Sequence, residues 1–212
     1  MVSSRLINGL LIATVILSCL YMEYTNILYV AINFAVCYDT VYMIYVLGIN
    51  KICGIVFLFI MLFFNTYMTN IYSIEPLFVL KIIFISQFSD IYQYVIGINC
   101  GINKIGYISK NKTYEGYIFG YLFTIGTFVP VLYLLNSFIE KKYTILTLSN
   151  PILVYSFVCS LVYFYGILGG LLSSLVKRSL NIKDYSDLLG PHGGWVDRID
   201  SIILPLLLIS EI

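Results

Sequence analysis

Charged side chains are scarce in this chain of 212 residues, because Asp, Glu, Lys and Arg together make up only 11% of it. Soluble domains carry about 25% charged residues. Hydrophobic residues make up 60% of the chain, and its mean hydropathy is +0.92. The sequence therefore predicts an integral membrane protein in contact with a lipid bilayer. Its net charge of +1 offers no basic surface, so we expect no nucleic-acid partner.

Paired cysteines are also lacking. The five cysteines show no CxxC spacing and lie mostly within apolar runs, which predicts small buried apolar side chains. The N-terminal apolar run has no clear small-residue cleavage site, so we expect a first helix there and no cleaved signal peptide. Aromatic residues are plentiful at 17%, and many of the 20 tyrosines are expected at membrane interfaces.

Long apolar runs fill most of the chain. The hydrocarbon core of a bilayer is crossed by a helix of about 20 apolar residues. Seven segments are candidates, the last of them short and interrupted by Pro205: Leu6–Met22, Ile27–Ile49, Ile52–Met68, Pro76–Ile98, Tyr117–Phe138, Pro151–Val176 and Ser201–Ile212. We expect an all-α, polytopic protein with about six full transmembrane helices and a short C-terminal hydrophobic segment, forming one domain over residues 1–212.

The basic residues predict the orientation of these helices. With a cytoplasmic N-terminus, the inner side receives Arg5, Lys51, Lys104, Lys110, Lys112, Lys177, Arg178, Lys183 and Arg198. The outer side receives only Lys141 and Lys142. This imbalance favours the cytoplasmic N-terminus and places both long polar loops on the cytoplasmic face.

One polar stretch, residues 174–200, contrasts with the apolar remainder. It holds four basic residues, four acidic residues and the only histidine and tryptophan, His192 and Trp195. Charges of both signs beside membrane spans are costly unless they serve a function or lie in water. The stretch is therefore a candidate functional site.

Its basic residues follow a helical spacing. Ser174, Lys177 and Arg178 are spaced i, i+3, i+4, so they share one face at the end of the sixth apolar segment. Taken alone, Lys177 and Arg178 are better explained as anchors that extend to the membrane interface. The complete ordered set of residues favours a site instead.

Its acidic residues suggest a metal site. Asp197 and Asp200 are three residues apart and share a face if this segment is helical. Their carboxylates repel each other unless a cation lies between them, and hard oxygen ligands suit Mg²⁺. Asp184 is a candidate third ligand, and Arg198 is placed to neutralise a phosphate.

The run from Gly190 to Gly194 predicts a tight turn whose exposed backbone N–H groups cradle phosphate oxygens. For His192, within that run, we favour a structural or phosphate-contacting role over proton transfer. For Trp195 we favour an anchor at the membrane interface over stacking on a base.

A second polar region covers residues 89–116. Asp90 lies near the end of an apolar run and is a candidate metal ligand. Lys112 and Thr113 offer a cation and a hydroxyl to a triphosphate, while Glu115 either pairs with Lys112 or holds a metal. The alternative is a solvated loop in which Thr113 caps a helix. Asp39, deeper in an apolar run, either forms a structural ion pair or lines a polar cavity.

The first stretch resembles the signature of the phosphatidate cytidylyltransferases, also called CDP-diacylglycerol synthases. The residues that carry the resemblance are Ser174, Lys177-Arg178, Lys183-Asp184, Ser186, Leu189, His192-Gly193-Gly194 and Asp197-Arg198-Ile199-Asp200. The run Ser109–Gly116 is similar to a second region of that family. Trp195 departs from the family, which has a smaller aliphatic residue or Phe there. Asn181 often is Gly, a mild change because Asn tolerates a left-handed backbone.

The resemblance implies a multi-pass helical enzyme of the cell membrane, with its site on the cytoplasmic face. It implies the Mg²⁺-dependent conversion of CTP and phosphatidate to CDP-diacylglycerol and pyrophosphate in phospholipid biosynthesis, and a homodimer. The implied catalytic residues are Lys183, Asp184, Asp197, Arg198 and Asp200. The implied substrate-binding residues are Ser174, Lys177, Arg178, His192, Gly193, Gly194, Lys112, Thr113 and Glu115. The implied metal ligands are Asp90, Asp184, Asp197 and Asp200.

Two alternatives stay open. One is another CTP-dependent lipid enzyme of the wider superfamily, such as a polyprenol or phytol kinase, or a CDP-archaeol synthase acting on ether lipids. Such enzymes generally lack the full acidic and glycine run that this chain keeps. The other is a transporter or a degenerate, non-catalytic membrane protein. Transporters often carry inverted repeats, and the sequence shows no such symmetry.

Overall fold

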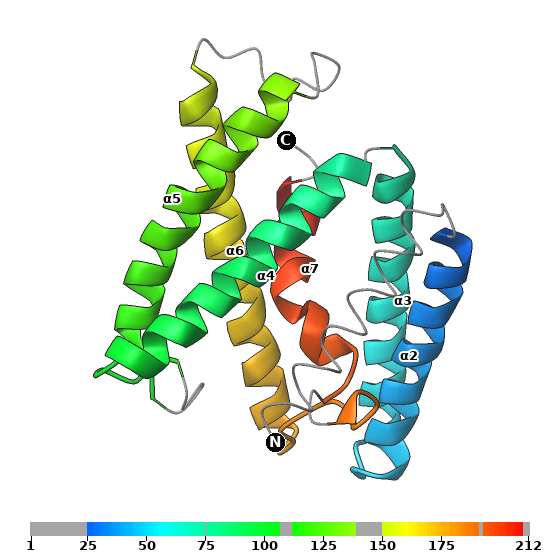
Figure 1. Ribbon diagram of the computed structural model, residues 1–212. Helices are drawn as coiled ribbons and strands as arrows, with labels where there is room; N and C mark the ends of the chain where they lie inside the picture. The colour runs from blue at the N-terminus through cyan, green and yellow to red at the C-terminus, as the bar shows by residue number, and fades with distance from the viewer. Residues whose placement is uncertain (1–24, 75, 107–111, 139–149, 191–192, 210–212) are drawn as a thin grey trace. The chain divides into compact units, whose positions relative to one another are not determined.

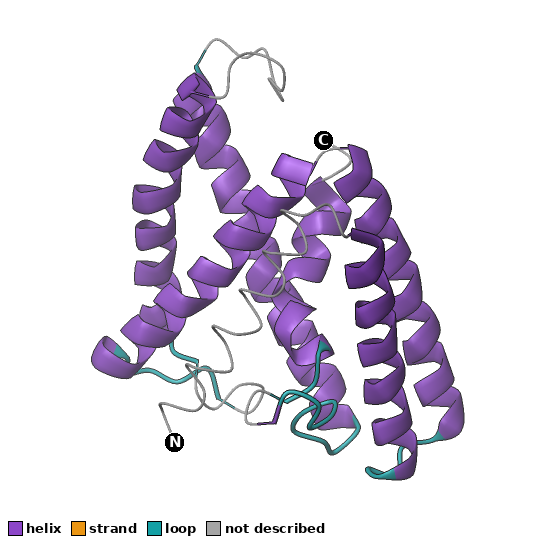
Figure 2. Cartoon of the chain, turned by 45° about the vertical axis from the view of Figure 1, so that its right-hand side comes forward, coloured by secondary structure: helices purple, strands orange, loops and turns teal. Residues whose placement is uncertain are grey.

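The structure is a computed structural model, and it describes residues 25–74, 76–106, 112–138, 150–190 and 193–209. Within these ranges the elements are α-helices, without a β-strand (Figures 1 and 2). The helices are α2 (Thr25–Tyr45), α3 (Lys51–Ile74), α4 (Pro76–Cys100), α5 (Tyr114–Phe138), α6 (Pro151–Ser179) and α7 (Val196–Ile209). The all-α class predicted from the sequence is confirmed for this part of the chain.

Four of the helices are long and apolar enough to cross a membrane. These segments are Lys51–Ile71, Val79–Cys100, Tyr114–Leu135 and Pro151–Ser179. The predicted first segment, Leu6–Met22, lies outside the described residues. The last helix begins at Val196 and not at the predicted Ser201, so both Asp197 and Asp200 are helical.

The described residues fall into two compact units, each with its own packing. The first contains α2, α3 and Val176–Ile199, which comprises the end of α6, a loop and the first turn of α7. Helices α2 and α3 lie side by side and antiparallel (Figures 1 and 2). Their core includes Met43 from α2 and reaches the loop through Ile182, Tyr185 and Val196. The loop is therefore held by hydrophobic burial and not only by polar contacts.

The second unit contains α4, α5, Pro151–Leu175 of α6 and the part of α7 from Asp200 onward. Small residues allow its helices to approach closely. A Cβ atom added at Gly169 of α6 would lie 2.5 Å from the Asp200 carbonyl oxygen, and Ser86 of α4 donates to the Ser201 carbonyl at 2.8 Å. Between α5 and α6, the buried Tyr163 donates its hydroxyl hydrogen bond to the Tyr117 carbonyl.

Candidate active site

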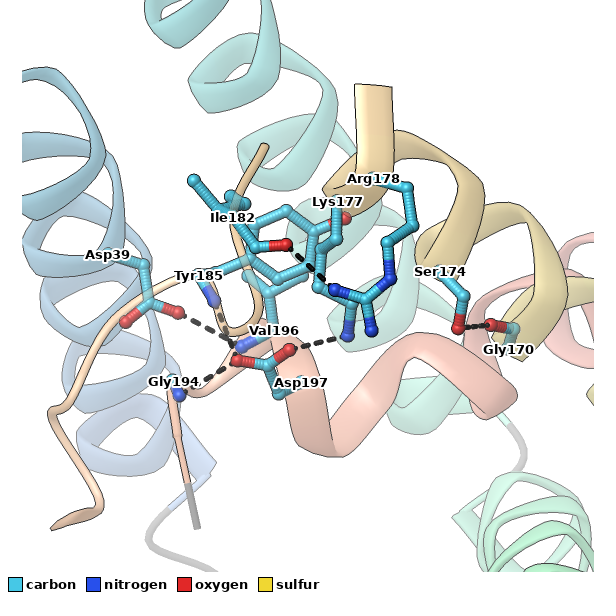
Figure 3. Close-up of polar contacts among 10 residues, drawn as sticks. All are labelled: Asp39, Gly170, Ser174, Lys177, Arg178, Ile182, Tyr185, Gly194, Val196 and Asp197. Atoms are coloured by element: carbon cyan, nitrogen blue, oxygen red, sulfur yellow. Dashed lines mark hydrogen bonds and ion pairs between the residues drawn. The ribbon is translucent and has the colours of Figure 1, made fainter. Parts of the chain in front are cut away.

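The Asp197 carboxylate is the centre of the polar contacts in the first unit (Figure 3). Its Oδ1 accepts a hydrogen bond from the Lys177 ammonium at 2.7 Å. Its Oδ2 accepts from the backbone N–H groups of Tyr185 at 2.8 Å and Gly194 at 2.9 Å. The Asp197 side chain is only 3% exposed. One carboxylate thus joins the last turn of α6, the loop and the start of α7.

The loop starts where α6 ends with a left-handed residue. Asn181 has a φ of 56°, as its tolerance of a left-handed backbone predicts. The Ile182 N–H donates to the Lys177 carbonyl at 2.9 Å, and the Asn181 N–H to the Arg178 carbonyl at 3.1 Å. This pair of bonds is the Schellman motif, which satisfies the last carbonyls of a helix. It turns the chain back so that the loop meets α7.

A second carboxylate, Asp184, lies close to Asp197. A Cβ atom added at Gly193 would lie 3.0 Å from the Asp197 Oδ2 and 3.4 Å from the Asp184 Cγ. Gly193 has a φ of 75° and is buried, so the absence of a side chain makes room for both carboxylates. Among the described residues no group donates a hydrogen bond to the half-buried Asp184.

This donor set fits a Mg²⁺ ion. Mg²⁺ is usually bound by one or two carboxylates together with water and substrate phosphates. Asp184 has all its lone pairs available within the described part of the chain, and Asp197 has three of about four occupied. No group of three or more His, Cys, Asp or Glu side chains is assembled among the described residues. The two carboxylates therefore suit a hydrated Mg²⁺ ion, whose remaining ligands would be water or phosphate oxygens.

Three cations of the stretch have exposed side chains: Arg178, Lys183 and Arg198. The Arg178 guanidinium donates to the Ile182 carbonyl at 3.3 Å, which orients it at the end of α6 (Figure 3). Lys177 differs, because its ammonium is bound to Asp197 and lies 5.2 Å from the centre of the Tyr185 ring. Lys177 is therefore engaged in contacts within the protein.

The glycine turn uses its N–H groups internally. The Gly193 N–H donates to the Gly190 carbonyl at 3.0 Å, and the Gly194 N–H donates to Asp197. Both glycines are buried, so these two N–H groups are not exposed to phosphate in this structure. Their contact with substrate stays a prediction. His192, within the same run, lies outside the described residues.

The second unit brings other predicted residues together. The Ser174 hydroxyl donates to the Gly170 carbonyl of α6 at 2.8 Å. A Cβ atom added at Gly170 would lie 3.4 Å from the Lys112 ammonium, which also lies 5.6 Å from the centre of the Tyr117 ring. Asp90 of α4 belongs to the same unit. Lys112 thus lies beside Gly170, one helical turn before Ser174, and beside Tyr117 of α5.

The remaining residues of that unit have structural contacts. The Thr113 hydroxyl accepts from the Gly116 N–H at 3.1 Å, so Thr113 caps α5. The Glu115 carboxylate accepts from the backbone N–H groups of Ile102 and Asn103 and from the Asn103 side chain at 2.7 Å. These contacts hold the loop before α5. Asp200 lies in α7, three residues after Asp197, so the two share a helix face.

For Asp39 the sequence left two alternatives, a structural ion pair or the lining of a polar cavity. The structure places this residue in α2, fully buried at 0% exposure. Its Oδ1 accepts from the Ser186 hydroxyl at 2.5 Å, and its Oδ2 from the Val196 N–H at 3.0 Å. The available signal was a carboxylate inside an apolar run, which is a functional candidate by default. The expected structural ion pair is not formed by the described residues, since Asp39 binds neutral donors.

The described residues thus combine helices long and apolar enough to cross a membrane with two neighbouring carboxylates and three exposed cations. The chain matches the sequence profile of the cytidylyltransferase family over residues 2–210. It therefore belongs to the cytidylyltransferase family.

Curated relatives agree with this family. The phosphatidate cytidylyltransferase of Aquifex aeolicus is 34% identical over 141 residues, which are 66% of this chain and 48% of the relative. The enzyme of the same name from Rickettsia bellii is 35% identical over 121 residues, 54% of this chain and 48% of the relative. The phosphatidate cytidylyltransferase of Staphylococcus aureus is 32% identical over 133 residues, which are 61% of this chain and 47% of the relative. The chain spans about half the length of these relatives.

Proposed function

We propose that the protein transfers the cytidylyl group of CTP to phosphatidate, giving CDP-diacylglycerol and pyrophosphate. The observation that carries the proposal is the pairing of Asp184 and Asp197 around Gly193, beside exposed cations, in a chain of the cytidylyltransferase family. In the reaction a phosphate oxygen of the lipid forms a bond to the α-phosphorus of CTP. The bond from that phosphorus to the β-phosphate oxygen breaks, and pyrophosphate leaves.

The two substrates are anions, so the site must offset their mutual repulsion. Arg178, Lys183 and Arg198 are exposed and supply positive charge for phosphate groups. A lipid phosphate monoester is already a nucleophilic anion near neutral pH, so no side chain has to remove a proton from it. The protein's main tasks are thus positioning and charge stabilisation.

We assign Mg²⁺ to Asp184 and Asp197, and the roles of Asp90 and Asp200 as metal ligands stay predictions of the family resemblance. Held by these carboxylates, the ion would supply positive charge to the phosphate groups of the substrates. The ion pair with Lys177 and the two backbone N–H groups hold Asp197 in one orientation before the nucleotide arrives. This preorganisation avoids the cost of ordering the carboxylate during the reaction.

The proposed topology follows from the distribution of charge. A cytoplasmic N-terminus with about six full spans in the cell membrane places residues 99–116 and 177–200 on the cytoplasmic face, where CTP is dissolved. The supporting observation is the concentration of basic residues in these loops. We extend the family resemblance to a homodimer.

The experiment is an assay of purified protein in mixed micelles with phosphatidate, Mg²⁺ and CTP labelled in its cytosine ring. We expect a lipid-soluble cytidine product from the wild type. Asp197→Asn should lower kcat by at least about 100-fold, since it removes charge from a proposed ligand. Asp187→Asn, a change to an exposed acid of the same loop, serves as the matched control and should retain most activity. The absence of labelled lipid with the wild type would contradict the proposal.

A further inference from the structure

Asp39 connects α2 to the loop that carries the candidate site. It lies in the first unit, as do Ser186 and Val196, from which it is separated by about 150 residues along the chain. The carboxylate accepts one bond on each oxygen, at 2.5 Å from the Ser186 hydroxyl and at 3.0 Å from the Val196 N–H. Figure 3 shows the second bond, with Asp39 facing the start of α7.

A fully buried carboxylate is expensive unless its oxygens are satisfied. Within the described residues Asp39 has no cationic partner, and Lys177 is paired with Asp197. Two neutral donors, one from the loop and one from α7, take the place of a counter-ion. A side chain that only accepts is well suited to bind two donors at once. The hydrogen bonds from Ser186 and Val196 thus explain how the Asp39 carboxylate can be buried.

The position that Asp39 holds is next to Asp197. Val196 is the first residue of α7, and its N–H is one of those that a helix leaves without an internal partner. Asp39 supplies that partner from another helix. Gly194 packs against the same carboxylate, since a Cβ atom added there would lie 2.7 Å from the Asp39 Oδ2 and 2.9 Å from the Ser186 Oγ. The contacts of Asp39 therefore fix the residues on both sides of Trp195 and set where α7 begins.

We propose that Asp39 is a positioning residue: it holds Ser186 and the first N–H of α7, and thereby orients the Asp197 carboxylate toward Asp184. The expected loss of activity on changing Asp39 rests on the proposed function, whereas the expected change around Trp195 does not. Asp39 acts through its acceptor geometry and not through a contact with substrate.

Three variants test this mechanism. Asp39→Leu keeps the branched shape of the side chain and removes both acceptors. Asp39→Asn keeps an acceptor for the Val196 N–H, and the Ser186 hydroxyl can rotate to accept from the new amide. Thr40→Val is the matched control, because Thr40 is the neighbouring buried polar residue of α2 and its hydroxyl donates only to the Val36 carbonyl of the same helix.

Trp195 provides a readout that is independent of catalysis. It is the only tryptophan, it lies between Gly194 and Val196, and its indole Nε1 is buried. We expect Asp39→Leu to shift the emission of Trp195 to longer wavelength and to increase its quenching by acrylamide. Asp39→Asn and Thr40→Val should leave both nearly as in the wild type. Circular dichroism would confirm that helix content is retained.

The same proteins are then assayed for lipid-linked cytidine. Asp39→Leu should lower kcat by about 10- to 100-fold, as loss of an orienting partner does, with a change in KM for CTP of less than about threefold. Asp39→Asn should restore at least a third of wild-type kcat, because geometry and not charge is the basis of the effect.

Two results would overturn the inference. One is an unchanged Trp195 signal in Asp39→Leu. The other is an Asp39→Asn protein as inactive as Asp39→Leu while its Trp195 signal matches the wild type, which would indicate a direct role for the charge. Should Asp39→Leu not fold, Ser186→Ala removes one of the two contacts and is expected to alter Trp195 in the same direction; no change there would also count against the inference. A wild type without product would contradict the proposed function alone, since Trp195 still reports on Asp39.

Discussion

Two glycines of the signature loop have the same kind of backbone and different surroundings. Gly190 has a φ of 57° and Gly193 a φ of 75°, both in the left-handed region. Among the described residues, a Cβ atom at Gly190 would meet nothing within 4 Å, whereas one at Gly193 would press on Asp197 and Asp184. Alanine substitutions at these two positions therefore distinguish the effect of backbone strain, which both share, from the effect of displacing the carboxylates.

We predict that Gly193→Ala abolishes nearly all activity, while Gly190→Ala retains most of it. Each substitution forces alanine into the left-handed region and should destabilise the protein by about 1 kcal/mol. Only Gly193→Ala also displaces the two carboxylates. Thermal unfolding in detergent and the lipid product assay measure the two effects. Equal loss of activity in both variants would show that strain alone explains the effect, against our assignment of the carboxylates.

Local patterns at the residue scale were readable from the sequence. The left-handed backbone of Asn181 follows from the chemistry of a single residue and is confirmed. The capping of α5 by Thr113, given as the alternative to a contact with a triphosphate, is likewise a local pattern and is observed. The partners of Asp39 could not be predicted, because they lie about 150 residues away and their meeting depends on how helices pack. That the Gly193 and Gly194 N–H groups bind the Gly190 carbonyl and Asp197 was not predicted either. These contacts depend on how the loop folds back onto the start of α7.

At the scale of elements, one ion pair joins the last turn of α6 to the first turn of α7. The Lys177 and Asp197 side chains are only 13% and 3% exposed. Removing one partner of a buried pair is far more costly than removing an exposed one, since it leaves an uncompensated charge.

We predict that Lys177→Met destabilises the protein by about 3 kcal/mol and reduces its activity. Lys177→Arg should be milder, because it keeps the charge. The double variant Lys177→Met, Asp197→Asn should recover part of the lost stability, because the stranded carboxylate is gone. A double-mutant cycle of unfolding midpoints measures this coupling. Strictly additive effects of the two substitutions would contradict the proposed pairing.

Helix types were predictable from hydrophobicity, but helix ends depend on caps. Helix α5 begins at Tyr114 and not at the predicted Tyr117, because the Thr113 hydroxyl binds the Gly116 N–H. Helix α7 begins at Val196, within a polar stretch that carries no apolar signal. Its first N–H is satisfied by Asp39 of α2 and not by a local capping residue. A start of this kind cannot be predicted from neighbouring residues.

At the scale of the whole molecule, the proposed function requires both polar loops to meet the compartment that contains CTP. We predict that Lys104→Cys and Asp187→Cys, each made in a chain whose native cysteines are replaced by alanine, react with a membrane-impermeant maleimide from the cytoplasmic side only. Both native side chains are exposed. Inverted and right-side-out vesicles, compared before and after detergent, measure the sidedness.

The two sites together decide the topology. Labelling of both from the cytoplasmic face agrees with the distribution of basic residues. Labelling of the two from opposite faces would contradict the proposed arrangement of spans, and labelling of both from the outside would reverse the orientation.

The central claim is that the cytidylyl group itself moves to the lipid, and the position of a radiolabel in CTP tests it most directly. Purified protein with phosphatidate and Mg²⁺ would be given either α-³²P-CTP or γ-³²P-CTP, and the label in the lipid phase would be counted. Cytidylyl transfer predicts label in the lipid from the α-position only, with the γ-label recovered in pyrophosphate. Label in the lipid from the γ-position would contradict the account and indicate a CTP-dependent lipid kinase.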